Sequence, residues 1–280
     1  MLQNILLPVD ESPAFEAAFA TALALAEASS GEATIDALYI LSVSKRTGRF
    51  LEDLSGMMGF EPVIVPEKVE SWYRNQGEML LSSVVERAHG RGVSARSVWD
   101  QGAVLERVAN HASAADLVVA GVGEDGVVAL SGQGECTADR FLKNCGTTAL
   151  MVPAAQVNFS GICLGFDGSD GANAALRSTR RLAQWMSCPV HVVCVEDPHS
   201  GKTNDPLKVA ETHLREAGVQ VTTALLSGEP HEVLQSECQS RGLGLVAVGF
   251  RGRVGLPGRV LGRVTEALIN ESGTALLVSR

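Results

Sequence analysis

The sequence contains two copies of one unit, and this repeat limits the possible folds more than any other feature. Residues 5–12 and 162–169 are each an apolar run that ends in Asp, with Ser two positions later. An Ala-rich stretch follows each run. Residues 115–121 resemble residues 243–249 in the same way. The chain therefore predicts two related domains rather than one large one.

The first copy is longer than the second. The copies are about 157 residues apart at their start and about 127 at their end, so the first carries an insertion of roughly thirty residues. We place it near 43–68, which is rich in glycine, proline and methionine and has no clear periodicity. We expect a first domain over 1–153 and a second over 160–280. The apolar cluster within 50–60 either packs on its own domain or forms a partner surface.

Short apolar runs alternate with helical patterns in both copies, and the second shows this best. Its runs lie near 161–166, 189–195, 219–226, 244–249 and 274–279. Such alternation is typical of βαβ units with a buried parallel sheet. We predict an α/β fold of two tandem doubly wound domains. Each would be an open, mostly parallel five-stranded sheet with helices on both faces.

Composition excludes several classes of protein. The 280 residues are 45% apolar and carry a net charge of −9, which argues against a nucleic-acid binder. No apolar stretch reaches eighteen residues and no signal peptide is evident, so we expect no membrane span. Six scattered cysteines and six scattered histidines have no metal-ligand spacing, which favours a reduced, cytoplasmic protein without a metal site.

A glycine-rich basic loop marks the expected ligand site. Ligands of open parallel sheets bind at the carboxyl ends of the strands, where Asp167, Val195 and Gly249 each end a predicted strand. Residues 249–265 contain four arginines and no acid before position 266. Glycine allows backbone amides to approach an anion, and the helix that begins near Gly262 favours phosphate at its N-terminus. The alternative is a solvated basic loop.

Asp167 together with the spacing Gly249-x2-Gly252-x9-Gly262 resembles the universal stress protein family in its tandem two-domain form. The resemblance covers nearly the whole chain and implies an adenine nucleotide, ATP or AMP, in the second domain. The implied contacts come from the strand ends and the loop: Asp167, Val195, Gly249, Arg251, Gly252, Gly262, Arg263, Val264 and Thr265. Arg263 stands where the family has Ser or Thr. Its guanidinium could bind phosphate in a bidentate manner or fill the phosphate site.

The first domain departs further from that pattern. Aligned on Gly121, the second glycine position is Glu124; aligned on Gly123, the final pair becomes Cys-Thr. Either alignment places acids where phosphates would lie, so we expect no nucleotide there. Asp10 then serves only as a turn residue. Gly121-x-Gly123-x-x-Gly126 matches a dinucleotide fingerprint, but it follows a late strand and is not expected to open a helix.

No catalytic base is evident, so we expect at most a slow ATPase in a stress-response or regulatory protein. The alternative is an interaction scaffold, or a binder of a small apolar ligand, with both nucleotide sites degenerate. The resemblance further implies that residues 148–152 and 274–279 pair the two domains within the chain, with a homodimer as a further option. Cys136 and Cys145 lie outside the apolar runs, which leaves exposure and redox chemistry open for them.

Overall fold

The fold is described from a computed structural model of the chain. It describes residues 3–29, 31–42, 66–123, 126–130, 136–154, 157, 159–196, 206–251, 261–271 and 273–280. Most of the expected insertion lies outside these ranges, and so does most of the glycine-rich loop, including Gly252. No helix among the described residues is long and apolar enough to cross a membrane.

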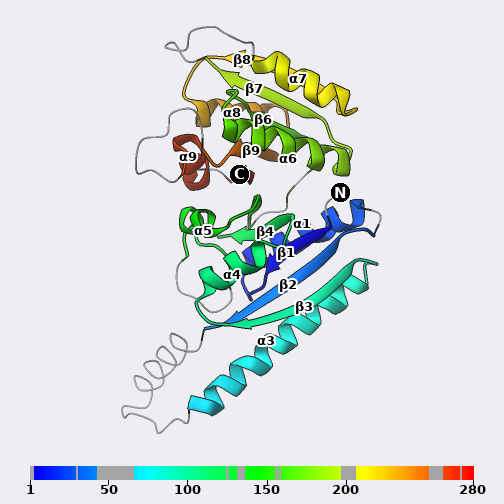
Figure 1. The fold of residues 1–280 in the computed structure, drawn as a ribbon, viewed down its shortest axis with the longest axis vertical. Coiled ribbons are helices and arrows are strands. Elements are labelled where there is room, and N and C mark those ends of the chain that lie inside the picture. The colour runs from blue at the N-terminus through cyan, green and yellow to red at the C-terminus, as the bar shows by residue number, and fades with distance from the viewer. Residues whose placement is uncertain are drawn as a thin grey trace.

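Ten strands form one continuous sheet in the order β3-β2-β1-β4-β5-β10-β9-β6-β7-β8 (Figure 1). The strands of the first unit are β1 (Asn4–Pro8), β2 (Thr34–Leu41), β3 (Ser94–Gln101), β4 (Leu117–Val122) and β5 (Ala149–Pro153). Those of the second unit are β6 (Ile162–Gly165), β7 (Val190–Val195), β8 (Val221–Leu226), β9 (Leu245–Gly249) and β10 (Ala275–Ser279). Within each unit, all pairings between these strands are parallel. The predicted α/β fold with tandem doubly wound units is confirmed.

Helices cover both faces of the sheet. One face carries α1 (Pro13–Ala28), α3 (Pro66–His89), α6 (Asp170–Met186) and α7 (Pro206–Glu216). The other carries α4 (Val104–Ala112), α5 (Ala138–Asn144), α8 (Pro230–Ser240) and α9 (Arg263–Glu271). Two buried apolar clusters, one on each face, run through both units. The inner strands are near-continuous apolar runs because both of their faces are buried, whereas the edge strands β3 and β8 carry exposed polar residues.

The two units meet at an antiparallel strand pair. Leu276 of β10 lies opposite Met151 of β5, and Leu277 lies opposite Leu150. This is the pairing that the resemblance implied for residues 148–152 and 274–279. It removes two exposed sheet edges, which would otherwise invite aggregation. The described edge strands are β3 and β8, at the two ends of the sheet in Figure 1.

The extra length of the first unit falls between β2 and β3. Helix α3 has 24 residues, whereas α7, its counterpart in the second unit, has 11. Part of the extra chain therefore lengthens α3, which extends beyond β3 in Figure 1. The predicted insertion at 43–68 overlaps the first turn of α3, and its residues 43–65 lie outside the described ranges.

Candidate functional site

The carboxyl ends of three neighbouring strands of the second unit form one edge. β6 lies between β9 and β7, so Asp167 sits between Gly249 and Val195 along this edge. The Asp167 carboxylate accepts a hydrogen bond from the Ser169 backbone N–H at 2.9 Å, and Ser169 caps α6. Asp10 makes the equivalent contact with the Ser12 N–H at 2.9 Å. Both aspartates thus hold the turn from the first strand to the first helix, independently of any ligand.

The chain leaves β9 directly over the start of α6. A Cβ on Gly249 would collide with the Gly171 backbone, and one on Gly171 would collide with the Arg251 carbonyl. Only two glycines allow the strand end and the helix N-terminus to approach this closely. The first residues of the loop are therefore fixed beside the Asp167 turn.

The base of the glycine-rich loop is closed by hydrogen bonds. The Gly262 N–H donates to the Phe250 carbonyl at 2.9 Å, so the two ends of the loop lie together. Thr265 is only 2% exposed, and its hydroxyl donates to the Gly249 carbonyl at 2.8 Å. This bond ties α9 to the end of β9 and gives the Thr265 hydroxyl a positioning role. Gly252, between these anchors, lies outside the described residues.

Two arginines and a half-buried valine complete the described part of the edge. Arg251 is exposed where the chain leaves β9, and Val264 packs on the apolar cluster beneath α9. Arg263 is the first residue of α9 and is largely exposed. Its Nη2 lies 2.9 Å from Oε2 of Glu229, which precedes α8. Arg263 is thus ion-paired across the edge to a residue that the sequence analysis did not single out.

The first unit closes the same edge with its own chain. A β-bridge joins Val128 to Val122, and the Ala129 N–H donates to the Gly121 carbonyl at 2.8 Å. Residues 128–130 are apolar and buried. Among the described residues of this loop, the N–H groups of Gly123, Gly126, Val128 and Ala129 all donate to carbonyls of the same unit.

Gly121 is the counterpart of Gly249. A Cβ there would collide with the Ala14 carbonyl in the first turn of α1, as one on Gly249 would collide with α6. Of the two alignments, the one on Gly121 is therefore correct. Glu124, Asp125 and Glu135, which were expected to repel phosphate, lie outside the described residues. Gly126 is followed by bridged residues rather than by a helix, which disfavours the dinucleotide fingerprint.

All six cysteines are buried free thiols. Exposure of Cys136 and Cys145, which the sequence left open, is therefore excluded because both side chains pack against the cluster beneath α5. Burial raises the pKa of the Cys136 thiol to about 11, so it is protonated at neutral pH. A protonated, buried thiol is a poor redox centre.

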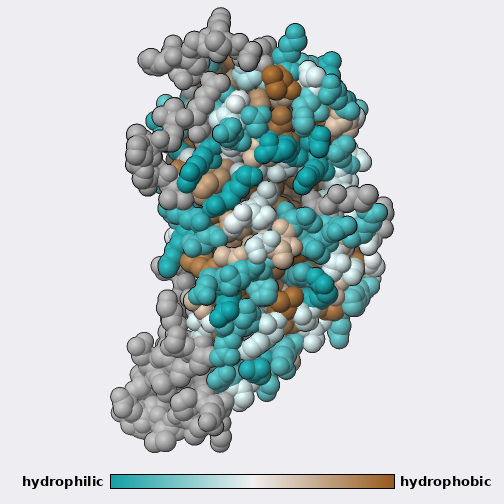
Figure 2. All heavy atoms as spheres, in the orientation of Figure 1, coloured by the Kyte–Doolittle hydropathy of each residue, from teal (hydrophilic) through white to brown (hydrophobic). Residues whose placement is uncertain are grey.

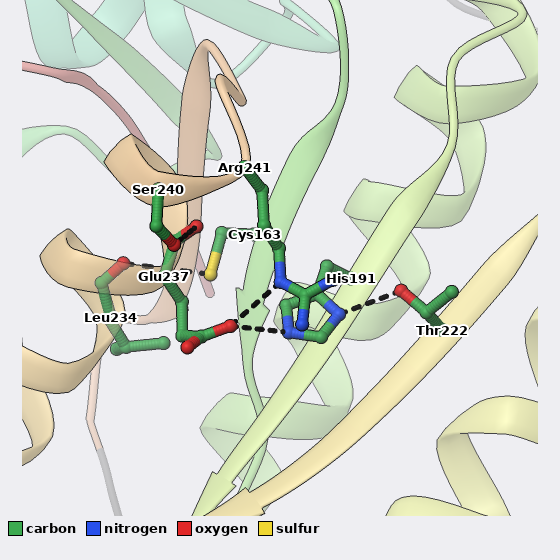
Figure 3. Close-up of polar contacts among 7 residues, drawn as sticks. All are labelled: Cys163, His191, Thr222, Leu234, Glu237, Ser240 and Arg241. Carbon is green, nitrogen blue, oxygen red and sulfur yellow. Dashed lines mark hydrogen bonds and ion pairs between the residues drawn. The ribbon is translucent and has the colours of Figure 1, made fainter.

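A buried polar network lies beneath α8, toward the amino ends of β6 and β7 and away from the carboxyl edge (Figure 3). His191 on β7 is 3% exposed; its Nδ1 lies 2.7 Å from Thr222 Oγ1, and its Nε2 lies 3.1 Å from Glu237 Oε2. Arg241 donates to the same carboxylate oxygen at 2.8 Å. Burial lowers the pKa of His191, and the hydrogen bond from Arg241 lowers the pKa of Glu237. An ionised Glu237 makes Nε2 the protonated nitrogen, so Nδ1 accepts from the Thr222 hydroxyl.

The surface offers little to an apolar partner on the face shown in Figure 2, where polar residues predominate and the apolar patches are small. The most exposed large apolar side chains of the described residues are Trp72, Met79, Val209 and Leu225. Trp72 and Met79 lie on α3, whereas Val209 and Leu225 lie on α7 and β8 of the other unit. These side chains are too far apart to form one continuous apolar binding surface.

Residues 158–280 match the family model described as the Universal stress protein family. The whole chain is similar in fold to a universal stress protein from Archaeoglobus fulgidus DSM 4304, with a TM-score of 0.73, 17% identity, and coverage of 99% of this chain and 98% of that one. A protein of unknown function from Pseudomonas aeruginosa PAO1 is similar over 99% of this chain and 92% of its own, with a TM-score of 0.61 and 13% identity. No curated protein matches the chain significantly.

Proposed function

We propose that this chain, whose second unit belongs to the universal stress protein family and which has the tandem form of that fold, binds an adenine nucleotide, ATP or AMP. The site is the carboxyl edge of the second unit, from Asp167 to Arg263. The observation that carries the proposal is the closed base of the glycine-rich loop. It holds Gly249 and Gly262 together beside the N-terminus of α6, with Arg251 and Arg263 at the same edge.

The chemistry of this edge suits a phosphate tail. Arginine side chains and glycine-rich backbone are the groups that bind phosphate oxygens most readily. Val195 and Val264 add half-buried apolar surface on either side of the turn that holds Asp167. A base stacked there would leave its phosphates toward the loop. We place no catalytic base, so the protein acts as a nucleotide-responsive regulator with at most slow hydrolysis.

The first unit has no such role in this proposal. Its loop folds back as buried apolar chain from Val128 to Leu130, and the described N–H groups there donate within the unit, which disfavours a phosphate at this edge. It serves as a structural partner of the second unit. The six buried free thiols support a reducing, cytoplasmic compartment.

Calorimetric titration with ATP and AMP tests the proposal. Wild type should bind, and Arg251→Glu should weaken ATP binding by about tenfold or more, because it reverses a charge at the phosphate end. Arg181→Glu is the matched control: this exposed arginine lies in the last two turns of α6, away from the edge. Its affinity should stay within about twofold of wild type. No binding by wild type at millimolar ATP would reject nucleotide binding and favour the scaffold.

A further inference from the structure

Arg263 stands where the universal stress protein pattern has Ser or Thr, and its guanidinium forms an ion pair with Glu229. The two side chains come from different elements, α9 and the start of α8, and their atoms lie 2.9 Å apart. A carboxylate and a phosphate are alternative partners for one guanidinium, because both accept its planar donors. Arg263 can therefore face Glu229 or a ligand phosphate at this edge.

The exposure of the pair makes the exchange feasible. The Arg263 side chain is 75% exposed and that of Glu229 is 54% exposed. Water screens such pairs strongly, so the bond to Glu229 holds Arg263 only weakly. The Glu229 carboxylate would remain close to a bound phosphate and repel it. Both effects act only on the charged part of a ligand.

We propose that Glu229 is a specificity-determining residue that competes with the ligand phosphate for Arg263. This inference rests on the nucleotide site proposed above and names the regulation of that site. The competition lowers the affinity for phosphorylated ligands and leaves the affinity for the nucleoside unchanged. The affinity of wild type for a phosphorylated ligand then depends on the charge of the phosphate tail and on ionic strength.

Titrations of wild type and Glu229→Gln with ATP, AMP and adenosine test this competition. The variant should bind ATP and AMP about two- to fivefold more tightly, and adenosine with unchanged affinity. The gain should shrink at about 0.5 M NaCl, where screening is strong. In the background of Arg263→Gln, the same substitution at position 229 should give a clearly smaller gain in ATP affinity, because only the direct repulsion by Glu229 is then relieved.

Glu232→Gln is the matched control, because Glu232 is an exposed acid in the first turn of the same helix. An equal gain from Glu232→Gln would assign the effect to net charge and overturn the competition. An unchanged ATP affinity of Glu229→Gln, or an equal gain for adenosine, would also overturn it. Thermal unfolding of each variant confirms that the fold is kept.

The outcomes for the two proposals are separable. Binding by wild type with no response to Glu229→Gln rejects the competition and keeps the nucleotide site. Absence of binding by wild type and by every variant rejects both.

Discussion

At the scale of single residues, the Thr265 hydroxyl is predicted to hold the loop base. Thr265→Val removes the donor to the Gly249 carbonyl in a buried environment. The free energy of unfolding should fall by about 1–3 kcal/mol, because an unpaired buried acceptor is costly. Thr265→Ser keeps the hydroxyl and should lose less. Urea denaturation measures both, and equal losses for Val and Ser would mean that packing, not the bond, matters.

His191 is predicted to make stability depend on pH. Burial lowers its pKa in the folded state, so below about pH 6.5 the unfolded chain binds a proton more readily than the folded one. Stability should therefore fall as pH falls below that value, by at most about 1.4 kcal/mol per pH unit from this group, until the lowered pKa is passed. Glu237→Gln should not remove this slope, because its own titration lies at lower pH.

His191→Gln should reduce the slope of the stability profile just below pH 6.5, measured by urea denaturation at each pH, and His213, whose pKa burial also lowers, accounts for part of the remaining slope. The exposed His89, at the end of α3, provides the control as His89→Gln. A slope that persists unchanged in His191→Gln would assign it to other groups.

At the scale of elements, Arg280 is predicted to fasten α5 to the second unit. Its Nη2 donates to the carbonyls of Leu142 and Lys143 at the end of α5, and its guanidinium lies 3.8 Å from the ring centre of Phe250. Arg280→Gln should lower the free energy of unfolding by about 1–3 kcal/mol and speed amide exchange in α5. Arg280→Lys should lose nearly as much stability as Arg280→Gln, since lysine lacks the planar donors of the guanidinium. Unchanged exchange in α5 would contradict the fastening role.

The elements also show what the sequence could and could not predict. Buried parallel strands are apolar runs, so the sequence located β6 to β10 to within a few residues. The fold-back at Val128 was missed because its bridge to Val122 is a tertiary contact; only a glycine followed by apolar residues hints at it. Glu229 was missed because it lies 34 residues from Arg263, and only the packing of α8 on α9 joins them.

At the scale of the whole molecule, the antiparallel pair of β5 and β10, called the seam below, is expected to make the two units unfold cooperatively. β5 and β10 are hydrogen-bonded partners, and each apolar cluster contains side chains of both units. Unfolding one unit would expose the buried face and strand edge of the other, at a large cost in apolar surface. The two units should therefore unfold in a single transition.

Tryptophan fluorescence can follow each unit separately, because Trp72 and Trp99 lie in the first and Trp185 lies in the second. The fluorescence of Trp185→Phe reports on the first unit, and that of a variant with both Trp72→Phe and Trp99→Phe reports on the second. Their urea midpoints should coincide after correction for the stability of each variant. Leu277→Ala, at the buried seam, should shift both reporters together by about 2–5 kcal/mol, because a cavity in a shared core weakens both units. A shift confined to Trp185 would mean that the two halves are stabilised independently, with the seam contributing pairing but no cooperativity.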